Sequence, residues 1–126
     1  MNRVLLIAFA GALGTLARYG ISTWAGKAFG PVFPYGTLFV NLAGCFLITF
    51  VAHYSLATTY VSETARLTVM TGFLGGLTTY SSFDLETTNL MRQGYWAVAA
   101  LYVGVTLGAC FVAGLLGLTL ARRAFG

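Results

Sequence analysis

The residues best suited to chemistry form one run of hydroxyl and aromatic side chains, from Thr78 to Phe83, directly after Gly75 and Gly76. Hydroxyl groups can donate hydrogen bonds to an anion, and aromatic ring edges carry a partial positive charge that an anion can approach. If the backbone unwinds here, the carbonyl groups of Gly75 and Thr78 become free to ligate a hard cation such as sodium. The run therefore has the chemistry of an ion site.

Asn41 is the most informative polar residue earlier in the chain. It stands between Thr37 and Cys45 at steps of four residues, and each step drifts only ~40° around a helix, so the three share a face. A carboxamide in hydrocarbon is costly unless it has a partner. The two N–H donors of Asn41 suit a dehydrated anion, and they equally suit a hydrogen bond that joins two helices.

A second stripe of weakly polar residues lies in the last apolar stretch. Tyr102, Thr106 and Cys110 again recur at steps of four residues. Ordinary packing explains this stripe as well, because Gly104 and Gly108 allow another helix to approach closely. We treat both cysteines of the chain as small buried residues, since their spacing matches no disulfide framework and no metal motif.

The charged side chains and the single histidine carry weaker indications. Arg18 is either an anchor that reaches the membrane surface or a cation that draws anions into a vestibule. Asp84 and Glu86 fit a solvated or interfacial end of the third apolar segment. His53 has no nearby acid to orient it, and the chain contains no hydrolase or phosphate-binding motif. We therefore predict that the protein is not an enzyme.

The elements that position these residues follow from composition. Of the 126 residues, 58% are hydrophobic and only 8% are charged, whereas soluble domains carry about 25% charged residues. A water-soluble fold of this size would expose very large apolar patches, so the bilayer is the solvent that fits. Spans of ~20 residues use up most of the chain, which predicts a single integral membrane domain over residues 1–126. The basic residues are scattered at span ends, which disfavours nucleic-acid binding.

We predict an all-α membrane protein with four transmembrane helices, at about residues 4–23, 35–56, 65–90 and 95–121. The third helix is expected to break near mid-membrane, over residues 75–82, because glycines and hydroxyl residues make a poor continuous helix. Such a break is tolerated only where it is buried in protein or lines a wet cavity. The alternative is an intact helix whose hydroxyl groups bond back to their own carbonyls. Gly72 and Gly76 allow a close approach of another backbone, for which a partner copy is one candidate.

The charge distribution bears on orientation. With four spans, both termini and the middle loop share one side of the membrane. That side holds four basic residues and the other holds three: Arg3, Arg66, Arg122 and Arg123 against Lys27, Arg92 and Arg18. Since the positive-inside rule then gives little preference, the chain can insert both ways, and two copies of opposite orientation can pair as an antiparallel homodimer.

Three stretches resemble the Fluc family of fluoride channels, also called the CrcB family. They are GALGTLARY at residues 11–19, GTLFVNLAG at 36–44 and GFLGGLTTYSSF at 72–83, and they occur in the expected order. The third stretch is the most specific of the three. Length and the number of spans also agree, so the likeness covers essentially the whole chain.

The resemblance implies a passive, selective fluoride channel in the bacterial plasma (inner) membrane, built as an antiparallel dual-topology dimer with two pores. Arg18 would be the vestibule arginine, and the carbonyls of Gly75 and Thr78 from both copies would hold a structural sodium ion at the dimer interface. Its partners would be fluoride, sodium, membrane lipid and a second copy. The fluoride path would be lined by Asn41, Tyr80, Ser81, Ser82, Phe83, Glu86, Tyr102 and Thr106.

Tyr80 departs from the family pattern, which usually has phenylalanine at this position. The ring edge is kept, but a phenolic hydroxyl is added. That hydroxyl can bond to the anion, to Asn41 or to water, or it can crowd a narrow pore. The permeation rate is therefore the property that this residue puts in question.

Two other functions fit the composition less well. Small multidrug transporters are also four-span, dual-topology dimers, but they need an acidic residue in the first span to exchange protons for cationic drugs, and residues 4–23 contain none. A structural or assembly subunit is the other alternative. Polar stripes on three spans argue against it, because such residues are costly in a membrane unless they line a path.

Overall fold

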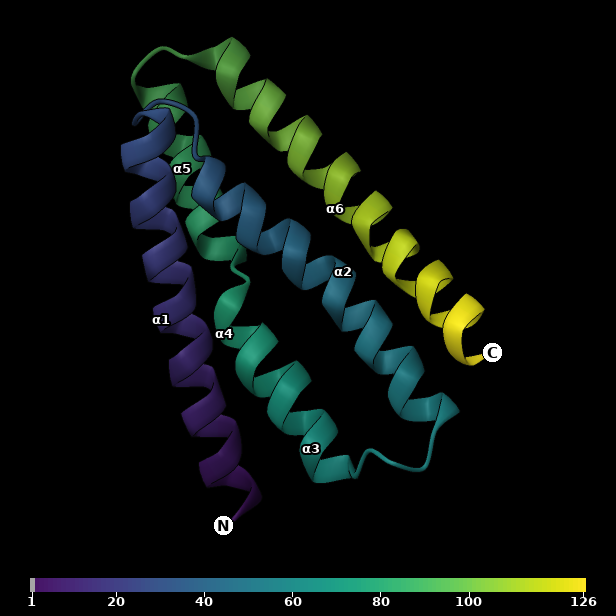
Figure 1. The fold of residues 1–126 in the computed structure, drawn as a ribbon. Coiled ribbons are helices and arrows are strands. Elements are labelled where there is room, and N and C mark those ends of the chain that lie inside the picture. The colour runs from purple at the N-terminus through teal and green to yellow at the C-terminus, as the bar shows by residue number, and fades with distance from the viewer. Residues whose placement is uncertain (1) are drawn as a thin grey trace.

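The computed structural model describes residues 2–126, and the elements in that range are all helical (Figure 1). Three long helices are α1 (Arg3–Phe29), α2 (Tyr35–Ala57) and α6 (Trp96–Phe125). Each of them is long and apolar enough to cross a membrane. The prediction of an all-helical membrane protein is confirmed at this level.

The third apolar segment is a helix in two halves. The first half consists of α3 (Glu63–Leu67), the π-helical turn η1 (Thr68–Leu74) and α4 (Gly75–Leu77), and the second half is α5 (Tyr80–Arg92). At 1.5 Å per residue each half is about 20 Å long. Neither half spans a hydrocarbon core of ~30 Å alone, but the two together do.

Local chemistry sets where the helices begin and end. The side chain of Asn2 accepts a hydrogen bond from the Val4 N–H at 2.6 Å and caps α1. Ser62 caps α3 in the same way. Gly30 ends α1 with φ at 89°, a left-handed conformation that glycine adopts without strain. The loop of residues 30–34 then holds Pro31 and Pro34, which fix φ and cannot continue a helix.

The three long helices and the broken segment alternate in direction. In Figure 1, α1 and the broken segment run one way, while α2 and α6 run the opposite way. Both chain ends and the link between α2 and α3 lie toward the same end of the bundle. The closest packing joins α2 to α6, and α1 packs mainly on η1 and α4.

Glycines permit the close approach of α1 to the first half of the broken segment. A Cβ atom at Gly14 would overlap the carbonyl of Phe73, and one at Gly76 would overlap the carbonyl of Gly11. A Cβ at Gly72 would lie 2.9 Å from the Ala10 side chain. The small residues at 72 and 76 thus serve a contact within the chain, with α1.

The helix bounds differ from the expected spans in detail. Helix α1 continues to Phe29, beyond residue 23, and α6 continues to Phe125, beyond residue 121. Their last turns carry Lys27 and Arg122, whose stems can lie along apolar surface while their charges reach water. Helical backbone therefore extends past the apolar stretches from which the spans were predicted.

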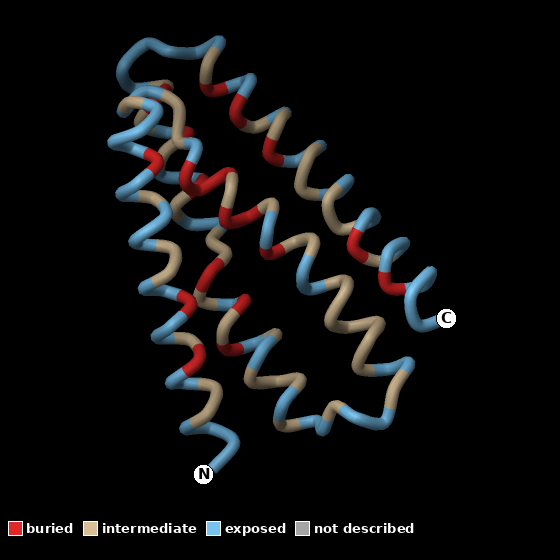
Figure 2. The backbone as a smooth tube through the Cα atoms, viewed as in Figure 1, coloured by how far each residue is buried: buried red, intermediate tan, exposed pale blue. Residues whose placement is uncertain are grey.

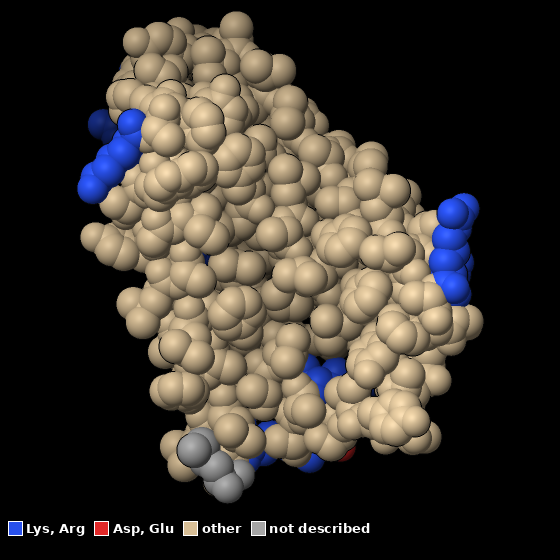
Figure 3. All heavy atoms as spheres, in the orientation of Figure 1, with Lys and Arg blue, Asp and Glu red and all other residues tan. Residues whose placement is uncertain are grey.

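The surface of the single chain is largely apolar. Buried residues concentrate in the first half of α2 and along one side of α6 (Figure 2). The largest core cluster joins α2, α5 and α6 around Phe83 and Tyr102. The face in Figure 3 is nearly uncharged across its centre, and its basic side chains lie at the upper left and right edges and toward the lower end. This distribution suits contact with lipid or with another apolar protein surface.

Candidate functional site

The helix break is confined to two residues, Thr78 and Thr79. Their backbones are extended, with φ and ψ of −88° and 154° at Thr78 and of −155° and 126° at Thr79. The expected break over residues 75–82 is wider than the observed one. Helix resumes at Tyr80 because the Thr79 hydroxyl caps α5, accepting a hydrogen bond from the Ser82 N–H at 3.1 Å.

Asn41 clamps the broken backbone. Its Nδ2 donates to the Thr79 carbonyl at 3.1 Å, and its Oδ1 accepts from the Thr79 N–H at 2.8 Å. The amide thus makes the bond between helices that was one of the two sequence interpretations. Within residues 2–126 the second N–H of Nδ2 has no protein acceptor, so it stays available to a ligand.

These bonds free two backbone carbonyls. In a continuous helix the Thr79 N–H would bond to the Gly75 carbonyl and the Ser82 N–H to the Thr78 carbonyl. Both N–H groups bond instead to side chains, those of Asn41 and Thr79. The carbonyls of Gly75 and Thr78 therefore lose their helical donors, although Gly75 itself is helical and not unwound as expected.

Arg18 supports the end of α4. From its place on α1, its Nε donates to the Gly76 carbonyl at 3.1 Å, and the residue is half-buried. A cation at the C-terminal end of a helix interacts favourably with the unbonded carbonyls there. Arg18 therefore belongs to the structure around the break, a position that neither of its sequence interpretations described.

A cavity of about 340 Å³, here called the break cavity, lies beside the extended residues. Its polar lining groups come from α2, the break and α6: the Asn41 amide, the threonine hydroxyls and two thiols. Thr106 is only 5% exposed, and its hydroxyl has no hydrogen-bond partner within residues 2–126. The lining consists of Asn41, Cys45, Thr78, Thr79, Tyr80, Phe83, Thr106, Leu107, Cys110 and Phe111.

Three aromatic rings continue from this cavity into the bundle. Tyr80 and Phe83 meet edge to face, with ring centroids 5.7 Å apart, and Phe83 meets Tyr102 in the same way at 5.0 Å. Phe83 and Tyr102 are buried, whereas Tyr80 is 77% exposed in the single chain. Tyr80 and Phe83 also line the break cavity.

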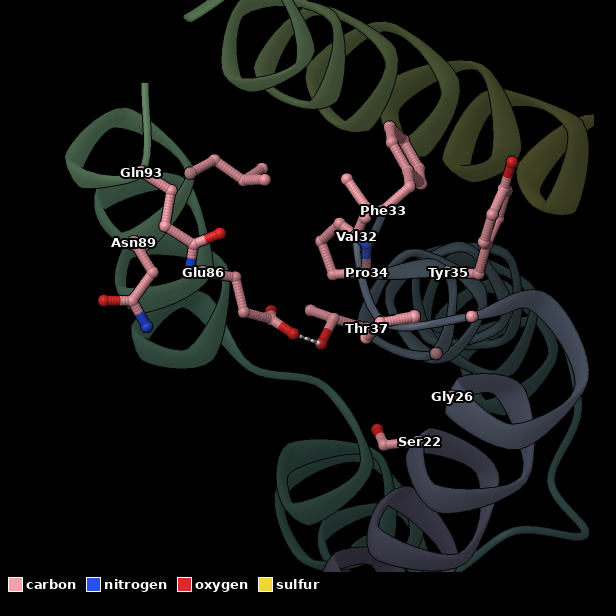
Figure 4. A pocket seen from close by; sticks show the side chains of 14 residues that line it. Ser22, Gly26, Val32, Phe33, Pro34, Tyr35, Thr37, Glu86, Asn89 and Gln93 are labelled. Carbon is pink, nitrogen blue, oxygen red and sulfur yellow. Dashed lines mark hydrogen bonds between the residues drawn. The ribbon is translucent and has the colours of Figure 1, made fainter. Parts of the chain in front are cut away.

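Glu86 lies in a second cavity of about 260 Å³, here called the loop cavity, next to residues 30–34 (Figure 4). Its two oxygens accept hydrogen bonds from the Thr37 hydroxyl at 3.0 Å and from the Tyr102 hydroxyl at 3.1 Å. The carboxyl group is therefore held between three helices and is half-buried, not a freely solvated helix end as expected.

The loop cavity has polar residues that sequence reasoning did not single out. Asn89 and Gln93 line it together with Glu86 and Ser22. The spacing of 86, 89 and 93 places these three side chains on one face of α5. That pattern was visible in the sequence and would have predicted a polar wall here.

Tyr102 links the two cavities. It packs against Phe33 of the loop cavity, with centroids 5.4 Å apart, and against Phe83 of the break cavity. The predicted path residues Asn41, Tyr80, Phe83 and Thr106 thus surround one cavity, and Glu86 faces the other. Ser81 and Ser82 line neither: Ser81 is exposed, and the backbone of Ser82 is used in the cap of α5.

Comparison with known proteins decides the family. The family model described as CrcB-like protein, Camphor Resistance (CrcB), matches residues 5–118. The chain belongs to the CrcB family. One CrcB relative, from Sorangium cellulosum (strain So ce56), is named fluoride-specific ion channel FluC and is 47% identical over 123 residues, 98% of this chain and 97% of that protein.

Other CrcB relatives carry the same name. The protein from Anaeromyxobacter sp. (strain K) is 47% identical over 97% of both chains. The protein from Roseiflexus sp. (strain RS-1) is 43% identical over 94% of this chain and 96% of its own length. The family resemblance seen in the three sequence stretches is therefore confirmed over nearly the whole chain.

Proposed function

We propose that this protein is a channel, not an enzyme, and that it conducts fluoride passively and selectively down its electrochemical gradient. The observation that carries the proposal is the break cavity, in which uncharged donors converge at a helix break. The names of the CrcB relatives, fluoride-specific ion channels, agree with it. The bacterial inner membrane is the compartment we propose.

Neutral donors suit a permeating anion. The free N–H of Asn41 and the unpartnered hydroxyl of Thr106 can replace water around fluoride, while the ring edges of Phe83 and Tyr80 add weak attraction. A channel must bind its ion well enough to admit it and weakly enough to release it. A full positive charge in the cavity would hold the anion too tightly.

The proposed path continues from the break cavity past Tyr102 toward Glu86 and the loop cavity. A carboxylate would repel fluoride, but the hydroxyls of Thr37 and Tyr102 hold both oxygens of Glu86. We include the hydroxyl groups of Ser81 and Ser82 at the opposite mouth, where Ser81 is exposed and lies 3.3 Å from the Thr79 hydroxyl.

A second copy of opposite orientation completes the proposed assembly. The apolar outer surface supports pairing of this kind, and so does the nearly even division of basic residues between the two sides of the membrane. The freed carbonyls of Gly75 and Thr78 are hard oxygen donors that suit sodium, but two are too few to enclose a cation. A partner copy would supply two more, and we therefore include in the proposal a structural sodium ion between the subunits and one pore on each side.

Ion efflux from liposomes tests the proposed function. Purified protein is expected to release trapped fluoride rapidly, measured with a fluoride electrode, and to retain chloride in a parallel sample. Equal loss of both ions would contradict selectivity.

Tyr80→Phe serves as the matched variant for this assay. The Tyr80 hydroxyl has no hydrogen-bond partner within residues 2–126, and phenylalanine keeps the ring contact with Phe83. We therefore expect the variant to pass fluoride at least as fast as the parent chain and still exclude chloride. If both proteins are silent in reconstituted liposomes, the fluoride assignment is wrong; if only the parent is silent, its phenol blocks the pore.

A further inference from the structure

The two cysteines of the chain meet in the break cavity. Cys45 comes from α2 and Cys110 from α6, and both are free and partly buried. Both line the break cavity, so the two helices bring their thiols to one cavity. In the sequence, 65 positions separate the two cysteines, and their spacing matches no disulfide framework and no metal motif.

Close packing of the two helices holds this pair. The Thr49 hydroxyl, one turn beyond Cys45, donates to the Gly114 carbonyl at 2.6 Å. A Cβ atom at Gly117 of α6 would overlap the Phe46 carbonyl of α2, so the missing side chain lets the two backbones approach. Cys110 stands one turn before Gly114 on the same helix. The two thiols are therefore presented from rigid elements and not from loops.

We propose that Cys45 and Cys110 form a two-coordinate site for a thiophilic divalent cation with a filled d shell, and that an ion bound there obstructs the break cavity. The mercuric ion is the probe of this class. Two thiols and one Hg²⁺ give a neutral S–Hg–S bridge and release two protons, so two S–H bonds break and two S–Hg bonds form. No oxidant is needed.

The ligand set selects this class of cation. Soft sulfur ligands favour soft metals, and no group of three or more His, Cys, Asp or Glu side chains that could hold a metal occurs within residues 2–126. Zinc commonly takes four ligands in closed protein sites, so two thiols are too few for a zinc site of this kind. A monovalent cation with two thiolates would leave a net negative charge in an apolar environment, which is costly. A divalent cation gives a neutral complex.

Asn41 and Thr106, the two donors assigned to fluoride, line the same cavity. An ion held between the thiols would occupy space that the anion must cross. This consequence rests on the proposed function, whereas the binding of mercury to the two thiols does not.

Mass spectrometry of the full-length protein tests the site directly. With HgCl₂ we expect one mercury per chain, the loss of two protons and the disappearance of both free thiols. A competing monothiol should strip mercury from Cys45→Ser or Cys110→Ser easily. Removing it from the parent protein should take a monothiol concentration about 100-fold higher, because the second thiol acts at a high effective concentration. Two mercury ions per chain, or mercury that links two chains, would overturn the site.

Fluoride efflux tests whether a mercury ion bound by the two thiols obstructs the break cavity. HgCl₂ should block efflux from liposomes that carry the parent protein and leave the Cys45→Ser/Cys110→Ser double variant unaffected. If the one-mercury bridge forms and efflux continues, the proposed obstruction is wrong although the site stands. If untreated liposomes release no fluoride, the proposed function fails, while the mass spectra still decide the site.

Discussion

Asn41 shows how one side chain can do two things at the helix break. Its carbonyl oxygen and one N–H pair with the backbone of Thr79, which would otherwise lose its partners where the helix is interrupted. A carboxamide has one donor more than this pairing needs. Structural support and ion contact therefore come from the same group, and the two interpretations made from sequence are not exclusive.

Replacing Asn41 by aspartate keeps the acceptor for the Thr79 N–H and removes both amide donors. An ionised aspartate has no donor and a charge that repels fluoride, and a protonated one has a single O–H in place of the two N–H groups. Fluoride efflux should fall by about tenfold or more, since hydrogen bonds to charged groups are worth ~1.5–3 kcal/mol. The thermal midpoint should fall moderately. Asn2→Asp is the control, because an aspartate caps α1 equally well; efflux unchanged in Asn41→Asp would contradict the role.

Thr106→Val tests a hydroxyl that the fold itself does not use. The buried hydroxyl has no partner within residues 2–126, so an isosteric apolar side chain should leave the unfolding free energy unchanged or raise it by ~1 kcal/mol. Fluoride efflux should nevertheless drop. Thr119→Val, which removes an exposed hydroxyl bonded to the Leu115 carbonyl in the same helix, should affect neither property. A marked loss of stability in Thr106→Val would show that the hydroxyl has a structural partner instead.

At the scale of the elements, the broken segment depends on α1 as much as on its own sequence. The π-helical turn and α4 lie so close to α1 that glycine is needed at both Gly14 and Gly76. Arg18 of the same helix bonds to the Gly76 carbonyl. Helix α1 therefore holds the first half of the broken segment, and Asn41 of α2 holds the break itself.

Gly14→Ala should disturb this contact. Its Cβ would overlap the Phe73 carbonyl, and overpacking of this kind costs about 1–3 kcal/mol. Gly20→Ala, on the same helix with open space around it, should leave stability unchanged or raise it through better helix propensity. Thermal unfolding in detergent, followed by circular dichroism, compares the two. Similar midpoints for both variants would mean that α1 can move away at little cost.

At the scale of the whole molecule, the single chain leaves much apolar surface uncovered. Its basic residues are divided almost evenly between the two ends of the bundle. Large apolar residues are exposed along α1 and α6, including Phe9 and Phe111. Such surfaces suit lipid tails and a second copy equally well. Orientation in the membrane then depends on a small difference in basic residues, which a few substitutions can change.

Charge variants test the proposed antiparallel assembly. Thr59→Arg/Tyr60→Arg adds basic residues to the link between α2 and α3, and Ala28→Arg/Ala97→Arg adds them at the opposite end; all four sites are exposed. Each variant alone should insert in a single orientation and give little fluoride efflux, and co-expression should restore it. Cysteine-accessibility labelling reports the orientation. Full efflux from either variant alone, once its single orientation is shown, would contradict an antiparallel pair.

Much of this protein follows from its sequence alone. Its composition predicts a membrane protein, because a chain with so few charged residues and so much apolar surface would not be soluble in water. The glycine and hydroxyl run after residue 74 favours an interrupted helix there, since such residues offer the backbone other partners, and the structure confirms the interruption. The family follows from the same stretch. These properties are local or additive along the chain, so no three-dimensional information is needed to infer them.

Only the tertiary structure decides which groups meet. The break is limited to Thr78 and Thr79 because the Asn41 amide and the Thr79 hydroxyl take particular N–H groups. Glu86 is held by Thr37 and Tyr102, and Cys45 and Cys110 line the same cavity. Apart from the local cap that Thr79 makes to Ser82, each of these arrangements joins residues from different segments of the bundle. Their geometry depends on how α1, α2 and α6 pack around the break, which no local pattern in the chain specifies.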